Sequence, residues 1–145
     1  MGSGQSATDG PGAAAWAPRA LSVFRIVFAL LFLSHGIVKL FGFPAGAQPG
    51  LVPFVSLGGV AGLLELFGGG AVLLGIFTRP VAFVLSGQMA VAYFMVHAPQ
   101  GIYPVLNGGE AAILYCFAFL HISAAGAGPW SIDGRGEARS GVGVR

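Results

Sequence analysis

Four long apolar stretches account for most of this chain of 145 residues. We place them at about residues 20–41, 53–77, 79–97 and 108–125, and a helix that crosses a bilayer needs roughly 20 such residues. Inside a bilayer only helices and closed barrels satisfy every backbone polar group, and stretches of this length favour helices. The sequence therefore predicts an all-α integral membrane protein, folded as a four-helix bundle in contact with the lipid bilayer.

The composition excludes several other classes of protein. Hydrophobic residues make up 55% of the chain and charged residues 8%, whereas soluble domains carry about a quarter charged residues. Four crossings leave little chain for a soluble catalytic domain. The formal net charge is +2, and the basic residues are scattered without the clustered run that is typical of nucleic-acid binding. We exclude nucleic acid as a partner.

The chain divides into one membrane domain and two tails. Residues 1–18 are rich in Gly, Ala and Ser, and residues 127–145 are rich in Gly, so we expect both to be flexible tails. The membrane domain is then residues 19–126. Within it, proline and glycine in residues 42–52 and 98–107 predict the loops that follow the first and third spans.

The distribution of arginines predicts the orientation. An even number of spans places both termini on the same side of the membrane. Arg19, Arg25, Arg79 and the arginines of the C-terminal tail all fall on that side, and short loops rich in Lys and Arg remain in the cytoplasm. Both termini are therefore expected to be cytoplasmic.

Glu65 lies near the middle of the second apolar stretch. A charged side chain at the bilayer centre costs roughly 2.5 to 3.5 kcal/mol, so it is normally paired, protonated or directed toward a polar cavity. With a rise of about 1.5 Å per residue, Gln88 falls at a similar depth and Arg25 closer to the cytoplasmic face. We expect Glu65 to meet one of these two side chains, either at a functional site or in a structural pair.

A second polar group is expected near the non-cytoplasmic face. Lys39, His97 and Glu110 fall within roughly 5 Å of that face, and His35 about one turn deeper. Interfacial positions for these residues, and packing for His121, are the structural alternatives. Together the predicted buried polar residues are Arg25, His35, Lys39, Glu65, Gln88, His97, Glu110 and His121.

The histidines do not predict a metal or haem site. A haem held between spans needs axial histidines at matching depth, and His35 and His121 differ by roughly 10 Å. His35, His97 and Glu110 follow no recognised ligand spacing. Cys116 is the only cysteine, which excludes a disulfide and a thiolate cluster within the chain. Any redox chemistry would have to come from a bound cofactor or a partner.

Small residues four apart predict close helix contacts in the second span. Gly58 and Gly62, and Ala71 and Gly75, have this spacing, which lets helix backbones approach each other in lipid. Such a contact suits packing within one chain or between the subunits of a homo-oligomer.

The short motifs of this chain, taken in order, resemble the DoxX family of small four-span membrane proteins. Five pieces carry the resemblance, over residues 19–133: Arg25 ahead of Phe32-Leu33-Ser34-His35-Gly36 and Lys39; Gly62-Leu63-Leu64-Glu65-Leu66-Phe67-Gly68-Gly69; Thr78-Arg79-Pro80; Asn107-Gly108-Gly109-Glu110; and Gly126-Ala127-Gly128-Pro129-Trp130-Ser131-Ile132-Asp133. Trp130 replaces a glycine that is common in the family. The resemblance implies a bundle in the cytoplasmic membrane of a bacterium or archaeon, and some relatives are associated with quinone-linked sulfur oxidation or redox-stress complexes.

The first functional hypothesis is a membrane subunit of a redox-linked system, associated with a membrane or soluble oxidoreductase. A quinone head group needs an apolar slot and a few hydrogen-bonding or proton-exchanging groups. His35, Glu65 and Tyr115 are the candidate quinone-binding residues, with Arg25 and Gln88 of suitable chemistry. If the protein is an enzyme, it is an oxidoreductase subunit that needs a cofactor or partner.

Two alternatives remain open. The first is a non-enzymatic assembly or scaffold protein, in which buried polar pairs fix the helix register. The second is a small proton-coupled transporter with Glu65 as the proton carrier. No internal repeat is evident in the sequence, which counts against the transporter.

Overall fold

The computed structural model describes residues 11–135, and these residues form helices and loops without a strand. The helices are α1 (Pro11–Phe41), α2 (Leu57–Leu63), α3 (Gly69–Leu74), α4 (Thr78–Ala92), α5 (Pro104–Asn107) and α6 (Glu110–Ala125). A π-helical turn, Leu64–Gly68, joins α2 to α3, and a second, Tyr93–His97, extends α4 into the 3-10 turn Ala98–Gln100. The all-α prediction is confirmed for the described residues.

Three helical stretches are long and apolar enough to cross a membrane: Trp16–Phe41, Leu57–Leu74 and Thr78–Gln100. The fourth predicted span corresponds to α6, an apolar helix of 16 residues. At about 1.5 Å per residue α6 reaches roughly 24 Å, less than the roughly 30 Å of the hydrocarbon core. The described residues therefore contain three helices of spanning length and a shorter apolar fourth.

The first helix begins earlier than predicted. It starts at Pro11, so residues 11–18, which we expected in a flexible tail, are helical. Proline is well suited to the first position of a helix, and the alanines that follow it are the strongest helix formers. Residues 1–10 of the predicted tail lie outside the described residues.

Local capping sets the ends of the second span. The helix starts at Leu57 rather than near Pro53, because the hydroxyl of Ser56 accepts a hydrogen bond from the Gly59 N–H at 3.1 Å. It ends at Gly75, whose φ of 70° lies in the left-handed region that glycine adopts without steric cost.

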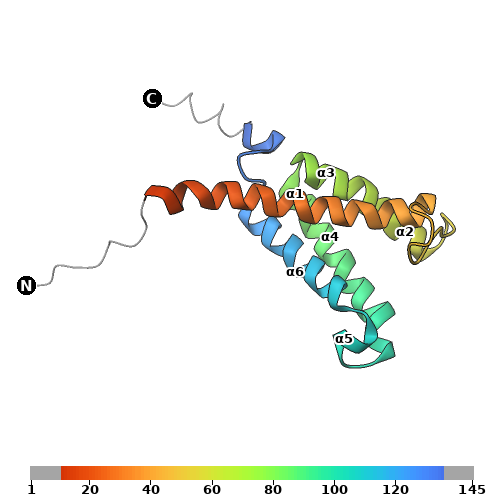
Figure 1. Ribbon diagram of the computed structural model, residues 1–145. Helices are drawn as coiled ribbons and strands as arrows, with labels where there is room; N and C mark the ends of the chain where they lie inside the picture. The colour runs from red at the N-terminus through yellow and green to blue at the C-terminus, as the bar shows by residue number, and fades with distance from the viewer. Residues whose placement is uncertain (1–10, 136–145) are drawn as a thin grey trace, which may run out of the picture.

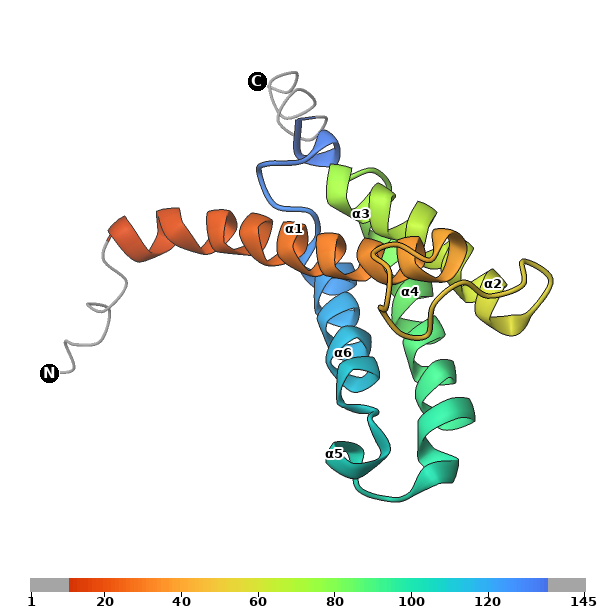
Figure 2. The same cartoon turned by 45° about the vertical axis from the view of Figure 1, so that its right-hand side comes forward.

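The helices form two pairs that cross. α1 packs along α2 and α3, and α4 packs along α6. Figures 1 and 2 both show α4 and α6 side by side, leading away from α1 instead of following its whole length. The end of α3, the start of α4 and the end of α6 gather at one end of this arrangement (Figure 2).

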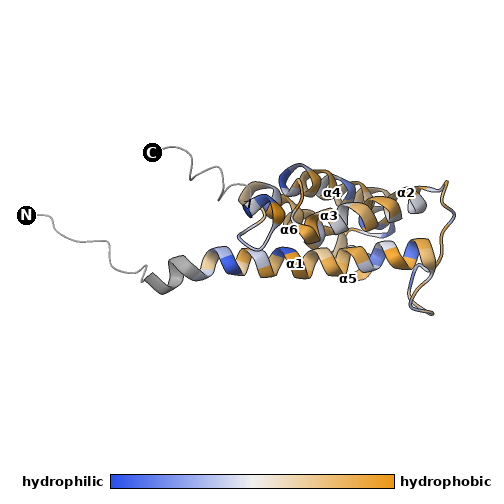
Figure 3. Cartoon of the chain, turned by 90° about the horizontal axis from the view of Figure 1, so that it is seen from above, coloured by the Kyte–Doolittle hydropathy of each residue, from blue (hydrophilic) through white to orange (hydrophobic). Residues whose placement is uncertain are grey.

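An apolar core lies where the pairs cross. Phe32 of α1 is 1% exposed, and its ring centroid lies 4.7 Å from that of Phe119 and 5.2 Å from that of Tyr115. The buried members of this core are Ala29, Phe32, Val72, Ala82, Leu85, Met89, Tyr115, Phe119 and Ile122. Figure 3 shows that apolar residues make up most of each helix, and many large apolar side chains outside the core are exposed, as contact with lipid requires.

Glycines bring α1 against the second span. A Cβ on Gly36 would lie 2.7 Å from the Leu66 nitrogen and 2.9 Å from the Gly62 oxygen, so the two backbones touch. Gly62 also faces the Lys39 side chain, at 3.1 Å. Gly58 faces Val52 of the preceding loop instead. The small-residue contact therefore lies within the chain and depends on Gly36, which the spacing argument did not single out.

Candidate functional site

Glu65 is the most deeply buried carboxylate among the described residues, with 1% of its surface exposed. It lies on the π-helical turn Leu64–Gly68, in the middle of the helical stretch Leu57–Leu74. A π-helical turn is rare, and in known proteins it often occurs at a functional site. The backbone and the burial together make Glu65 the centre of the candidate site.

Lys39 forms an ion pair with Glu65. Its Nζ atom contacts Glu65 Oε1, and its side chain is 18% exposed against 2% for that of Glu65. The close approach of α1 at Gly36 brings Lys39 to this turn. The membrane depths estimated from the sequence grouped Lys39 with His97 and Glu110. They followed the backbone position of each residue and neglected the length of the lysine side chain, which can reach along the helix.

Gln88 of α4 also reaches the same carboxylate. Its Nε2 atom lies 3.4 Å from Glu65 Oε1 and donates to the Ala61 carbonyl at 3.3 Å. Since both of these partners are acceptors, Nε2 must face them and Gln88 Oε1 must face elsewhere. Gln88 was one of the two partners that depth suggested for Glu65.

Two buried acceptors of this site have no partner in the described part of the chain. They are Glu65 Oε2 and Gln88 Oε1. A buried acceptor left without a hydrogen bond costs about 1 to 3 kcal/mol, and more if it is charged. The site, which we call the Glu65 site (Lys39, Glu65 and Gln88), therefore has room in its hydrogen bonding for a donor from a ligand.

His35 lies one helical turn before Lys39 on α1 and is exposed. Its ring packs edge-on against the nearly buried ring of Tyr115, with centroids 5.7 Å apart. An imidazole on the outside of a membrane-spanning helix would face hydrocarbon unless a ligand or partner covers it. His35 and Tyr115 thus mark the surface beside the Glu65 site.

The other predicted polar residues lie apart from this site. His97 Nδ1 donates to the Asn107 carbonyl at 3.0 Å, at the far end of α4. Glu110 is exposed at the start of α6, where a carboxylate is favourable to the helix dipole. His121 is exposed and packs edge-on against Phe24, at 5.8 Å between ring centroids. Of the eight residues predicted to be buried, three are exposed (His35, Glu110 and His121), and the outer group predicted around Lys39, His97 and Glu110 does not form.

Arg25 forms a separate polar centre and does not contact Glu65. It is fully buried, and its Nη1 donates to the carbonyls of Val72 and Leu73 at 2.5 Å each. Its Nε donates to Ala127 at 2.7 Å and its Nη2 to Trp130 at 2.6 Å. Arg25 thus binds two carbonyls at the end of α3 and holds the chain that follows α6.

That chain, Gly126–Gly134, we call the closing segment. We expected it to be flexible from residue 127. Instead it folds back onto the bundle, where the buried Arg25 of α1 donates hydrogen bonds to it. The Trp130 N–H donates to the Ser22 hydroxyl at 3.2 Å, and the Asp133 N–H to the Gly75 carbonyl at 2.9 Å. The sequence did not predict that this segment lies next to Arg25, because the two are about 100 residues apart in the chain. Residues 136–145 of the predicted tail lie outside the described residues.

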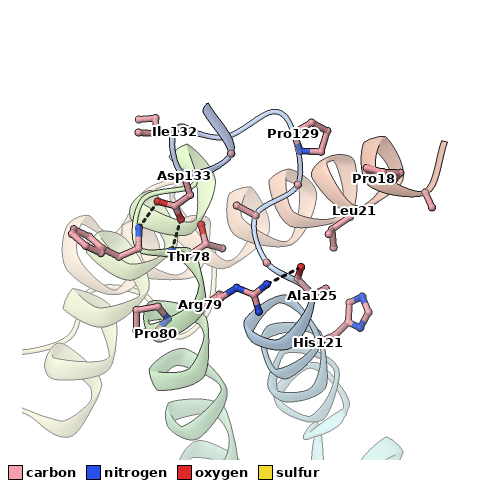
Figure 4. Close-up of a pocket in the computed structure, with 16 residues that line it drawn as sticks. Pro18, Leu21, Thr78, Arg79, Pro80, His121, Ala125, Pro129, Ile132 and Asp133 are labelled. Carbon is pink, nitrogen blue, oxygen red and sulfur yellow. Dashed lines mark hydrogen bonds between the residues drawn. The ribbon is translucent and has the colours of Figure 1, made fainter. Parts of the chain in front are cut away.

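Asp133 caps the start of α4 from the closing segment (Figure 4). Its carboxylate accepts hydrogen bonds from the backbone N–H groups of Phe77 at 3.1 Å and Thr78 at 2.8 Å. Partial burial alone would raise the pKa of Asp133, but these hydrogen bonds and the charge of Arg25 lower it below its ordinary value. The acceptor that caps α4 thus comes from a residue 55 positions after Thr78 in the chain.

Metal binding has no structural support within residues 11–135. They contain no group of three or more His, Cys, Asp or Glu side chains that could hold a metal ion. The chemistry available at the Glu65 site is hydrogen bonding and proton exchange by an amine, a carboxyl and an amide.

Comparison with known proteins adds a family and one close relative. The family model described as DoxX matches residues 20–98. An uncharacterized protein of Haemophilus influenzae is 40% identical over 124 residues, which cover 81% of this chain and 91% of that protein. No solved structure matches the chain. The region matched by the family includes the Glu65 site and Arg25.

Proposed function

Because this chain belongs to the DoxX family, we propose that it is a membrane subunit of a redox-linked system and that its Glu65 site binds the head group of a quinol. The protein would lie in the cytoplasmic membrane of a bacterium or archaeon. The proposed enzyme activity, if any, is that of an oxidoreductase assembled with a partner.

A four-span topology with cytoplasmic termini belongs to this proposal. α6 runs back along α4, so it brings the chain to the end of the molecule where α4 begins (Figures 1 and 2). Arg79 at the start of α4 and the closing segment after α6 thus share one end, with Arg19 on the first turns of α1. A basic end of this kind favours the cytoplasmic face.

The observation that carries the proposal is the pair of buried acceptors that have no partner within residues 11–135, Glu65 Oε2 and Gln88 Oε1. A quinol offers hydroxyl donors that could satisfy them, and its ring suits an apolar membrane-buried surface. The residues present thus fit a quinol better than a ligand that carries only acceptors. When bound, a quinol would supply two electrons and two protons, which no side chain here can store.

The residues of the site would have different tasks. Glu65 would accept a hydrogen bond from the hydroxyl group, and Lys39 would keep the carboxylate charged by its ion pair. Gln88 would orient the head group through its free carbonyl. His35, exposed one turn away, would exchange protons between the site and the surface of the helix. Electrons would pass to a partner protein.

The test is quinol retention by the purified protein in lipid nanodiscs, measured by mass spectrometry. Glu65→Gln and His35→Ala should each weaken retention about tenfold, the usual effect of losing one good polar contact. Glu110→Gln and His121→Ala are matched controls, because they remove exposed groups of the same chemistry elsewhere. Equal retention by Glu65→Gln and wild type, in a protein that melts normally, would reject the proposal.

One observation favours a purely structural role as the second candidate. Arg25 and Lys39 join parts of the chain that lie far apart in sequence, which is what polar contacts that hold a fold together would do. In that case neither wild type nor Glu65→Gln should retain quinol, whereas the quinol-binding role requires retention by wild type. Quinol retention by wild type therefore separates the candidates.

A further inference from the structure

A hollow of about 1130 Å³ lies at the end of the molecule where α4 begins and α6 ends (Figure 4). Four parts of the chain form its wall: Ala17, Pro18 and Leu21 of α1; Phe77, Thr78, Arg79 and Pro80; His121 and Ala125 of α6; and Gly126–Pro129 with Ile132–Gly134 of the closing segment. Most of these side chains are apolar. The polar side chains among them therefore determine which ligand could be held.

Arg79 supplies a positive charge to this wall. Its Nη1 donates to the carbonyls of Ala124 at 2.5 Å and Ser123 at 3.2 Å, at the end of α6. No carboxylate in the described part of the chain forms an ion pair with Arg79. The guanidinium is exposed, and a Cβ on Gly126 would come within 3.1 Å of its Nη2, so the bare glycine backbone makes room for it.

The surroundings do not neutralise this charge. Arg19, Arg79 and Arg135 are exposed and lie near this end, while Arg25 is buried beneath it. The carboxylate on the wall is that of Asp133, which is already occupied by the backbone N–H groups of Phe77 and Thr78. A net positive field therefore remains, and it favours an anion.

His121 adds a second group that can bind an anion. Its ring is exposed on the wall, packs edge-on against Phe24, and its nitrogens make no hydrogen bond to residues 11–135. Figure 4 shows Arg79 reaching from the start of α4 to Ala125 at the end of α6, where its Nη2 donates to the carbonyl at 3.5 Å, and His121 one helical turn earlier on α6. Two donors from neighbouring helices, beside an apolar wall, match a phosphate group attached to an acyl chain.

We propose that this hollow binds the phosphate head group of an anionic phospholipid, with Arg79 and His121 as its donors. The hollow lies where the spanning stretches begin and end, at the depth of lipid head groups, and basic pockets between membrane helices commonly bind such lipids. The apolar side of the wall at Leu21 would accommodate the first carbons of an acyl chain. This site is separate from the Glu65 site and does not depend on quinol binding.

The experiment is native mass spectrometry of the full chain, exchanged into mixtures of phosphatidylglycerol and phosphatidylcholine. Wild type should retain one phosphatidylglycerol molecule preferentially. Arg79→Gln combined with His121→Ala should reduce that retention about tenfold or more, because both charge-assisted contacts are lost. Arg19→Gln, which removes a charge from the same end but not from the wall, is the matched control and should retain the lipid.

A second variant keeps the proposal testable if the first is unstable. Leu21→Trp narrows the apolar side of the hollow while leaving every charge in place, and it should also weaken preferential retention. Equal retention by Leu21→Trp and wild type would overturn the site, as would an equal loss in Arg19→Gln, which would indicate only a diffuse charge effect.

Inorganic phosphate distinguishes the source of the phosphate group. If the ligand is a lipid, millimolar phosphate should neither displace phosphatidylglycerol nor raise the melting temperature of the delipidated protein. Displacement by phosphate alone, lost in the double variant, would overturn the lipid assignment in favour of a soluble phosphate compound.

Discussion

Two buried charges of this protein have opposite surroundings. Every nitrogen of the Arg25 guanidinium donates to a backbone carbonyl, from α3 on one side and the closing segment on the other. Glu65 is buried to the same degree, yet one of its oxygens has no partner among residues 11–135, and Gln88 beside it repeats this deficit. Every nitrogen of Arg25 thus has a partner within the fold, whereas the Glu65 site leaves two buried oxygens without one among the described residues.

The difference separates structure from function. A buried polar group that is fully hydrogen-bonded holds its surroundings in one arrangement, and removing it leaves several groups unpaired. A buried polar group that lacks hydrogen-bond partners lowers the stability of the fold. Its presence is therefore better explained by a ligand or a proton that it binds. We therefore expect stability to depend most on Arg25 and quinol binding to depend most on Glu65.

The largest effect on stability should come from Arg25→Ala. The change removes four hydrogen bonds to backbone carbonyls, of which only that of Val72 keeps a second donor, the Gly75 N–H. It should lower the free energy of unfolding by roughly 3 to 5 kcal/mol. Thermal unfolding in detergent measures this, with the exposed Arg19→Ala as the control. A loss no greater than that of the control would remove the distinction between the two centres.

Lys39→Met tests the other side of the comparison. The change leaves the buried Glu65 carboxylate without its ion-pair partner. It should lower the free energy of unfolding by about 3 kcal/mol, as when one partner of a buried ion pair is removed. Glu65→Gln should cost about 1 kcal/mol, because the partly exposed lysine can extend toward water. The double variant should recover most of the loss. A Glu65→Gln variant less stable than Lys39→Met would contradict this view of the site.

Gly36→Ala sharpens the comparison by separating the two centres. A Cβ at residue 36 would press on the backbone of Leu66 and Gly62, so α1 must move away from the turn that carries Glu65. Overpacking of this kind costs about 2 kcal/mol. Quinol retention should fall with it, while protease protection of the closing segment, which depends on Arg25, should persist. Loss of that protection would show that the centres are coupled.

The positions of the helices could be predicted from the sequence, but their crossing could not. Apolar length alone placed the spans within a few residues, except where capping by Ser56 or the helical start at Pro11 intervened. The contacts that arrange the helices are the close backbone approach at Gly36, between α1 and the second span, and the hydrogen bonds of Arg25 to α3 and to the closing segment. Such contacts join residues far apart in sequence, and no local pattern reports them.

The candidate site was partly predictable for a similar reason. Helical depth brought Gln88 toward Glu65, since both lie near the middle of their spans. The same estimate of depth did not predict the ion pair between Lys39 and Glu65. That contact depends on the length of the lysine side chain and on the π-helical turn Leu64–Gly68, neither of which the estimate included. It could not assign Asp133 to the start of α4, because the residues between them include a whole helical hairpin.

The smallest effect is expected at Asp133, which links pH to the Arg25 centre. Its pKa is lowered in the folded protein, so its contribution to stability is present above the pKa of the unfolded chain. That contribution is lost as the pH falls through the lower folded value. Asp133→Asn should cost about 1 kcal/mol at neutral pH, the usual effect of weakening a helix cap.

Fluorescence of Trp130, in a Trp16→Phe background, would follow the release of the closing segment. Wild type should release it as the pH falls below the ordinary pKa of an aspartate, whereas Asp133→Asn should be looser at neutral pH and change less on acidification. If both proteins respond to acid in the same way, the titrating group lies elsewhere. In that case Arg25 holds the closing segment without help from Asp133, and the hydrogen bonds of Arg25 to this segment do not depend on the protonation of Asp133.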